Sequence, residues 1–149
     1  MFEVLIVEDD NFKKEALVDL IGSNVPNARI QCVADVSTAV AAINQSKFHL
    51  IIIDMALPSH PVVSGGGSPM SLLTGGLEVL LELNSLERTD HCIIVTQYPD
   101  IEIAGNFYAL DAATAAIREN LSCNVIGCFQ YAENSSDWSE ALLRVLNTI

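Results

Sequence analysis

Residues 48–58 read FHLIIIDMALP, and this stretch decides the interpretation of the rest of the chain. Four consecutive apolar residues, Leu50 to Ile53, lead directly into Asp54. An apolar run of this length predicts a strand that is covered on both faces, as in a parallel sheet. Taken alone, Asp54 is best explained as the first residue of a turn that Pro58 ends. A second acidic strand end, near the N-terminus, changes this interpretation.

Four other stretches predict strands, and helices are expected between them. The strands are FEVLIV (2–7), RIQCVADV (29–36), HCIIVT (91–96) and NVIGCFQY (124–131). Helical spacing or composition predicts helices over 12–21, 38–45, from about 77 onward, over 104–121 and over 137–146. Asp10 or Asn11 is the expected cap of the first helix and Gly22 its end, while Ser37 or Thr38 is expected to cap the second.

This alternation of strand and helix predicts an α/β fold. We expect a flavodoxin-like, doubly wound sheet of five parallel strands in the order 2-1-3-4-5, with helices on both faces. We also expect one domain over residues 1–149, interrupted by a Gly/Ser-rich insertion at 59–76 that holds five of the eight glycines. The insertion is expected to be poorly ordered or to fold over the pocket as a lid, because it follows the strand that carries Asp54.

Composition narrows the possible partners. Seven Lys and Arg residues face 19 Asp and Glu residues, for a net charge of −12, which disfavours nucleic acids and anionic membranes. No apolar run approaches the roughly 20 residues of a membrane span, and no basic region precedes the first apolar run. These features predict a cytoplasmic protein. Cys32, Cys92 and Cys128 stand in apolar surroundings and are expected to be small buried residues.

The acidic strand ends predict a metal site. In the expected order, the first and third strands are neighbours, so Glu8, Asp9 and Asp54 meet at one edge of the sheet. Carboxylates this close repel one another unless a cation joins them, and their hard oxygen atoms suit Mg²⁺. Thr96 ends the neighbouring strand, where its hydroxyl can donate to a phosphoryl oxygen.

In this order, VLIVEDD, FHLIIIDMALP, GGLEVLLEL and IIVT resemble the receiver domain of two-component response regulators over nearly the whole chain. The resemblance implies that Asp54 accepts a phosphoryl group from a histidine kinase or phosphotransfer protein. It implies that Asp9 binds Mg²⁺ directly, Glu8 through water and Ala56 through its backbone carbonyl, with Thr96 as the switch hydroxyl. It further implies a signalling protein rather than an enzyme, with a downstream protein partner on the last strand and its flanking helices.

The sequence departs from the family at several positions. The family's lysine at the end of the last strand falls on Tyr131, or on Gln130 if the register slips by one. The family's switch aromatic residue falls on Cys128, or on Phe129 in the slipped register. Gln97 follows Thr96 where the family usually has a very small residue, and is expected to crowd the pocket. The lysines are residues 13, 14 and 47, so the sequence predicts a pocket without a lysine.

Two functions therefore remain open. One is an atypical phosphoacceptor receiver, which the three acids and Thr96 favour. The other is a pseudo-receiver that keeps the fold for protein interaction without phosphotransfer, which the missing lysine and Gln97 favour. A small phosphatase-like hydrolase with an acid-metal site is less favoured, because Ala56 stands where such enzymes usually have a second aspartate.

Overall fold

The computed structural model describes residues 1–61 and 71–149. In these ranges the helices are α1 (Asn11–Asn24), α2 (Val36–Gln45), α3 (Gly75–Ser85), α4 (Leu110–Leu121) and α5 (Asp137–Leu146). The strands are β1 (Phe2–Val7), β2 (Ala28–Val33), β3 (Leu50–Ile53), β4 (Leu57–Pro58), β5 (Ser71–Leu72), β6 (His91–Thr96), β7 (Asp100–Ile103), β8 (Asn106–Ala109) and β9 (Val125–Gln130).

The main sheet has the predicted topology. Within the described residues its five strands run in the order β2-β1-β3-β6-β9, and every neighbouring pair is parallel. Numbered along the main sheet alone, this is the order 2-1-3-4-5, and the predicted flavodoxin-like α/β fold is confirmed. Register places Val7 of β1 opposite Ile53 of β3, so these two strands end side by side.

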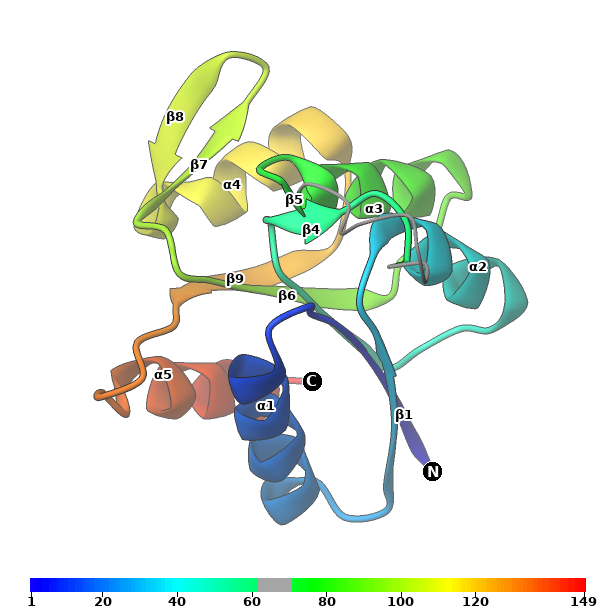
Figure 1. The fold of residues 1–149 in the computed structure, drawn as a ribbon, viewed down its shortest axis with the longest axis vertical. Coiled ribbons are helices and arrows are strands. Elements are labelled where there is room, and N and C mark those ends of the chain that lie inside the picture. The colour runs from blue at the N-terminus through cyan, green and yellow to red at the C-terminus, as the bar shows by residue number, and fades with distance from the viewer. Residues whose placement is uncertain (62–70) are drawn as a thin grey trace, which may run out of the picture.

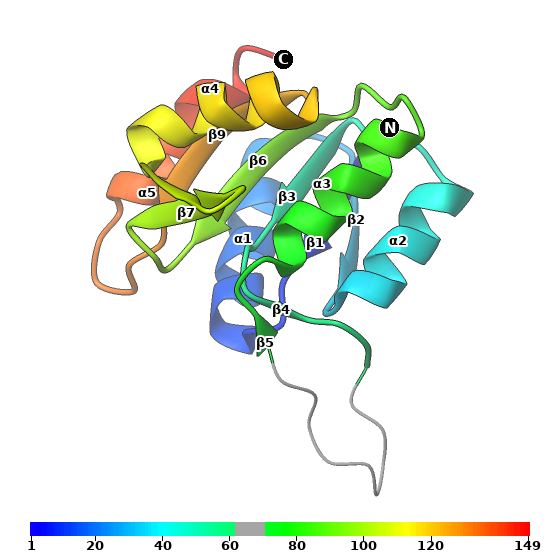
Figure 2. The same ribbon diagram turned by 90° about the horizontal axis from the view of Figure 1, so that it is seen from above.

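Helices cover both faces of the sheet, as the apolar character of its strands requires. In Figure 1, α1 and α5 lie on one face and α2, α3 and α4 on the other. Alternate residues of each strand supply the two cores: Leu5 and Ile51 pack toward α2, α3 and α4, whereas Ile6 and Ile52 pack toward α1 and α5. Figure 2 shows the helices flanking the twisted sheet from above.

Three expectations for the first half of the chain are wrong. Helix α1 continues through Gly22 to Asn24, because nothing about an exposed glycine near a helix end forces the chain to leave the helix. Strand β2 ends at Val33 rather than at 36, and Asp35, not Ser37 or Thr38, caps α2. The Asp35 carboxylate accepts from both the backbone N–H and the hydroxyl of Thr38, which fixes the start of the helix two residues earlier.

The helix predicted over 104–121 is also wrong in its first part. Residues 100–109 form the antiparallel hairpin β7–β8, which projects from the molecule in Figure 1, and α4 begins only at Leu110. Ala104 and Gly105 occupy the turn with φ angles of 52° and 84°. Two positive φ values are those of a type I′ turn, which matches the twist of a hairpin. Ile101 and Ile103 alternate with exposed residues and bury their side chains.

The insertion predicted at 59–76 is shorter at its C-terminal end than expected. Helix α3 already begins at Gly75, and Leu57–Pro58 pair with Ser71–Leu72 in an antiparallel arrangement. Residues 62–70 lie outside the described residues, and the prediction of a disordered segment or lid falls largely on them. A further expectation fails outside the insertion, since Cys32 is exposed on β2 rather than buried.

Candidate functional site

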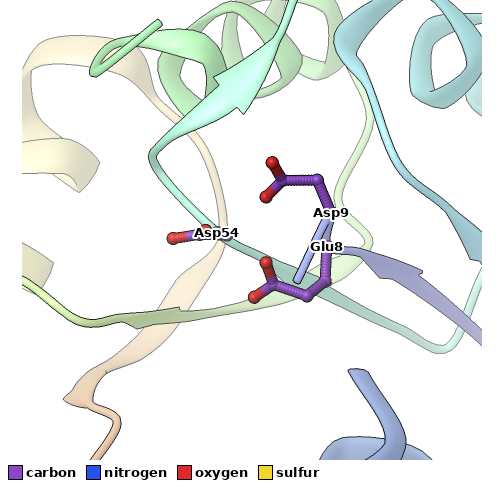
Figure 3. A group of neighbouring side chains, drawn as sticks. All are labelled: Glu8, Asp9 and Asp54. Carbon is purple, nitrogen blue, oxygen red and sulfur yellow. The ribbon is translucent and has the colours of Figure 1, made fainter. Parts of the chain in front are cut away.

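Three carboxylates meet at the carboxyl ends of β1 and β3. Glu8 and Asp9 follow β1, and Asp54 follows β3. The hydrogen bonds between neighbouring strands extend one residue past each strand end. The Asp54 N–H donates to the Val7 carbonyl (3.0 Å), and the Glu8 N–H donates to the Val33 carbonyl (2.9 Å). One carboxylate oxygen from each acid lies within 4.8 Å of the others. Figure 3 shows the three groups directed to the same side of the sheet edge, as the sequence predicted.

The N-terminus of α3 packs directly on the segment that carries Asp54. A Cβ atom built on Gly76 would lie 2.5 Å from the Asp54 carbonyl oxygen and 2.8 Å from the Met55 sulfur. The Gly76 N–H donates to the Met55 carbonyl at 3.0 Å. Only glycine permits this approach, so the glycine pair that begins α3 fixes the backbone beneath the acids.

Two of the three acids are almost inaccessible to water. Glu8 and Asp54 are 2% and 3% exposed, whereas Asp9 is exposed. Burial raises the pKa of Asp54, and Lys13 partly offsets this effect. Burial also raises the pKa of Glu8, and the negative charge of Asp54 raises it further, while Lys13 lowers it. Two buried carboxylates side by side therefore need a cation to remain ionised.

A lysine supplies that cation, and the predicted absence of a lysine from the pocket is wrong. Lys13 is fully buried in α1. Its Nζ lies 2.5 Å from Glu8 Oε1 and 3.2 Å from Asp54 Oδ1, and it donates to Gln97 Oε1 at 3.0 Å. An ammonium group has three N–H donors, and three acceptor oxygens surround this one. Lys13 thus donates one hydrogen bond, to Gln97, and forms ion pairs with Glu8 and Asp54.

The turn between β1 and α1 holds Lys13 in place. The Asp10 N–H donates to Glu8 Oε2 at 3.1 Å, and Asp10 Oδ1 in turn accepts from the Lys13 N–H as the cap of α1. The Lys13–Glu8 ion pair closes this ring of contacts. Backbone and side chain of Lys13 are therefore both tied to the strand end that carries the acids.

The sequence contained a signal for this residue. Lys13, Leu17 and Ile21 are the buried residues of α1 and are spaced by four, whereas Phe12 is 76% exposed. Phe12 is apolar but lies on the outer face, and the buried face of the helix begins with Lys13 instead. A helix face that combines Lys13 with two aliphatic residues and begins beside three acids indicates a buried ion pair.

Beside the buried acids, a pocket opens to solvent. It has a volume of about 350 Å³ and is lined by Asp9, Asp10, Asp54, Ala56, Gln97 and Tyr98. The backbone N–H of Ala56 hydrogen-bonds to the Asp54 carboxyl group and partly offsets the rise in its pKa that burial causes. Gln97, expected to crowd the pocket, lines it and also binds Lys13.

Thr96 ends β6 at the same sheet edge but is fully buried. Its hydroxyl accepts from the Tyr98 N–H at 3.3 Å, and the next two residues, rather than Thr96, line the pocket in the described part of the chain. Any contact between the Thr96 hydroxyl and a pocket ligand therefore needs a small rearrangement of residues 97–98.

The positions where the family's lysine and switch aromatic residue fall have other contacts here. The Tyr131 ring packs on Trp138 of α5, with centroids 5.0 Å apart, and Gln130 Nε2 donates to the Gln97 carbonyl at 3.1 Å. Cys128 accepts a hydrogen bond from the Thr114 hydroxyl on the α4 side of the sheet. Phe129 lies on the opposite side, with its ring against Gly127.

The donor set fits a divalent metal ion. Three carboxylates that approach within 4.8 Å form a hard-oxygen site next to an open pocket, and the ammonium of Lys13 already meets two of them. Such oxygen ligands suit Mg²⁺, which usually keeps several waters. The exposed Asp9 is best placed to reach an ion in the pocket, since Glu8 is buried behind it.

Comparisons with known proteins identify the family of this chain. No family model matches the chain. The chain is 32% identical over 148 residues to the Detocs response regulatory protein DtcB of Vibrio alginolyticus, with 97% of this chain and 99% of that protein covered.

None of the helices in the described ranges has the length and apolar character that a membrane crossing requires.

Solved structures share the fold at lower identity. The Mn²⁺-bound response regulator Rcp1 aligns with a TM-score of 0.65 at 17% identity, over 97% of this chain and 91% of its own. The receiver domain of the sensor histidine kinase PA1611 from Pseudomonas aeruginosa, which holds a magnesium ion in its active-site cleft, aligns with a TM-score of 0.59 at 20% identity, over 99% and 95%. With its acidic strand ends, its sheet order and its similarity to a response regulatory protein along the whole chain, this protein belongs to the response regulator receiver family.

Proposed function

We propose that this receiver accepts a phosphoryl group on Asp54 with the help of Mg²⁺. The observation that carries the proposal is the meeting of Glu8, Asp9 and Asp54 within 4.8 Å, beside an open pocket that Asp54 itself lines. Asp9 and Asp54 would hold the ion, together with the Ala56 carbonyl and, through water, Glu8. When bound, Mg²⁺ offsets the negative charge that gathers on the phosphoryl oxygens.

The chemistry is the formation of an acyl phosphate. A carboxylate oxygen of Asp54 forms a bond to phosphorus, while the bond from phosphorus to its donor breaks and its electron pair leaves with the donor. With a phosphohistidine donor the broken bond is P–N and the imidazole nitrogen takes a proton; with acetyl phosphate it is P–O and acetate leaves. The reaction needs an ionised Asp54; burial raises the pKa of this group, and Lys13 partly offsets the rise.

The remaining roles follow from this proposal. Thr96 would act as the switch hydroxyl, and a histidine kinase or phosphotransfer protein would supply the phosphoryl group. A downstream protein would bind the face formed by β9 and its flanking helices. Cys128 and Tyr131 mark the family's switch aromatic and lysine positions without carrying those side chains. One domain over the whole chain and a cytoplasmic location, both expected from the sequence, belong to the same proposal.

One observation favours the alternative of a pseudo-receiver without phosphotransfer. The Lys13 ammonium contacts both Glu8 and Asp54, so the acids are partly neutralised before any metal binds. In that case the fold would serve protein interaction, and the ion pair would be structural.

Calorimetric titration separates these two functions. Wild type in excess Mg²⁺ is titrated with beryllofluoride, which mimics a phosphoryl group on a carboxylate, beside the Asp54→Ala variant. The phosphoacceptor predicts saturable, Mg²⁺-dependent binding to wild type and none to the variant. Bound Mg²⁺ without any beryllofluoride response would instead support the pseudo-receiver.

A further inference from the structure

We propose that Lys13 of α1 is the cation that binds the phosphoryl group on Asp54, and that it does so by exchanging Glu8 for a phosphoryl oxygen. This inference rests on the proposed phosphoacceptor function. It places the positively charged partner of the phosphoryl group on α1, the helix after the first strand. The last strand, where the family has its lysine, carries no such residue here.

Position is the first argument. Lys13 Nζ lies 3.2 Å from Asp54 Oδ1, so it is already in contact with the carboxylate that would carry the phosphoryl group. Among the described residues, the other cations with assigned contacts point elsewhere. Arg88 pairs with Asp90, Arg29 with Glu3, Arg118 donates to Val125, and Lys14 donates to Asn11.

Charge is the second argument. Phosphorylation replaces the single negative charge of Asp54 by a group with about two negative charges and three strong acceptor oxygens. Together with Glu8 and Asp9, the phosphoryl group would make the pocket strongly negative. A divalent ion alone does not balance this negative charge, so Lys13 is needed as a second cation. Lys13 is fully buried, so its interaction with a phosphoryl oxygen would be weakly screened by solvent.

Exchange of partners is the third argument. In the present structure the ammonium already contacts three oxygens, as many as it has N–H groups: it donates to Gln97 and forms ion pairs with Glu8 and Asp54. A phosphoryl oxygen can be accepted only if one of these oxygens is released. Glu8 is the partner whose charge a metal ion beside Asp9 would offset, which frees Lys13 to turn toward the phosphoryl group. Asp10 holds the Lys13 backbone, so the exchange requires movement of the side chain alone.

Gln97 connects this exchange to the last strand. Its side-chain oxygen accepts from Lys13 at 3.0 Å, while its backbone carbonyl accepts from Gln130 at the end of β9. Gln97 directly follows β6 and is bonded to the end of β9. A shift of Lys13 toward the phosphoryl group would therefore change a contact of the residue that joins these two strands.

The first test compares Lys13→Met with the matched variant Lys14→Met, both titrated with beryllofluoride in excess Mg²⁺. Loss of a charge-assisted contact of about 1.5–3 kcal/mol predicts that Lys13→Met binds beryllofluoride roughly 10- to 100-fold more weakly. Lys14→Met should bind like wild type. In the absence of fluoride, Lys13→Met should bind Mg²⁺ at least as tightly as wild type, because a competing cation is gone. Equal beryllofluoride affinity of Lys13→Met and wild type would overturn the proposal.

The second test uses wild type, so that it does not depend on the folding of a variant. With isotopically labelled lysine, a ¹⁹F–¹H Overhauser effect from bound beryllofluoride is sought at the three lysines of the chain. The proposal predicts contact with Lys13 and none with Lys14 or Lys47. Saturation of the protein without contact to Lys13 would overturn this inference and leave the proposed function standing. If Mg²⁺-loaded wild type binds no beryllofluoride at all, the proposed function fails and this inference fails with it.

Discussion

Lys13 Nζ lies 3.2 Å from Asp54 Oδ1, although the two residues come from different elements, α1 and the end of β3. The same ammonium lies 2.5 Å from Glu8 Oε1. Removal of one charged group from a buried cluster of a lysine and two carboxylates is strongly destabilising, because the charges of the remaining groups are left buried and uncompensated. This relationship links the stability of the protein to the occupancy of its site.

The first prediction concerns the stability of the metal-free protein. Lys13→Met should lower the free energy of unfolding by about 3–5 kcal/mol in EDTA, because Glu8 and Asp54 lose their cation. Saturating Mg²⁺ should restore part of this loss, since an ion bound to the same acids replaces the missing charge. Urea unfolding with and without Mg²⁺ measures both effects. Lys14→Met is the control, and a Lys13→Met variant as stable as wild type in EDTA would refute the structural role of the ion pair.

The second prediction concerns the glycines of two helices. Gly76→Ala should destabilise the protein and weaken Mg²⁺ binding, because the new Cβ would press on the Asp54 carbonyl and the Met55 sulfur. Gly22→Ala is the matched variant, since a Cβ there meets no heavy atom within 4 Å. It should stabilise the protein by about 0.5–1 kcal/mol through the helix propensity of alanine. Thermal unfolding and Mg²⁺ titration of both variants test this contrast. Equal stability and equal Mg²⁺ affinity of the two variants would contradict the prediction.

The third prediction concerns pH and an ion pair at the opposite end of the sheet. The Arg88 guanidinium binds both carboxylate oxygens of Asp90 and also donates to the Ile43 and Ser46 carbonyls at the end of α2. Burial raises the pKa of Asp90, but hydrogen bonds from Arg88 and the Phe48 N–H outweigh this effect and hold the pKa below its usual value.

A carboxyl group with a lowered pKa stabilises the fold above its unfolded-state pKa of about 3.9 and loses this effect as the pH falls through its folded-state pKa. Asp90→Asn should therefore cost about 1.5–3 kcal/mol at pH 7, and its difference from wild type should shrink below about pH 4. Urea unfolding across this pH range measures it. Asp19→Asn, on the exposed face of α1, serves as the control. A pH-independent difference would contradict the assignment.

The fourth prediction concerns the hairpin turn between β7 and β8. Ala104 has a φ of 52°, a conformation in which alanine is strained and asparagine is tolerated. Ala104→Asn would create the Asn-Gly pair that type I′ turns prefer, and should raise the free energy of unfolding by about 0.5–1 kcal/mol. Gly105→Ala should have the opposite effect, since its φ of 84° favours glycine. Thermal unfolding of the pair tests the turn type, and destabilisation by Ala104→Asn would argue against it.

The sequence predicted the sheet and its acidic edge well, because both depend on local patterns. The buried strands are continuous apolar runs, and the strands that end in Glu8 and Asp54 are neighbours in any sheet of this order. His91–Thr96 and Asp137–Leu146 match their predicted bounds, since each is a single uninterrupted pattern.

The errors occurred where tertiary contacts override local composition. Asn106–Ala109 looked helical beside an alanine-rich segment, yet it pairs with Asp100–Ile103 because the latter has apolar residues at every second position. The sequence predicted a pocket without a lysine, and lysine is almost never fully buried unless it is paired. The partners of Lys13 lie at positions 8, 54 and 97, and only the folded chain brings the last two to the helix.

The most direct measurement is the chemical identity of the phosphorylated residue. Wild type and Asp54→Asn are incubated with acetyl phosphate, with Mg²⁺ or with EDTA, and the acyl phosphate is trapped by borohydride reduction and located by peptide mass spectrometry. The account predicts modification of wild type at Asp54 that requires Mg²⁺ and is absent from Asp54→Asn. An unmodified Asp54 in Mg²⁺-loaded wild type, or a label on another residue, would contradict it.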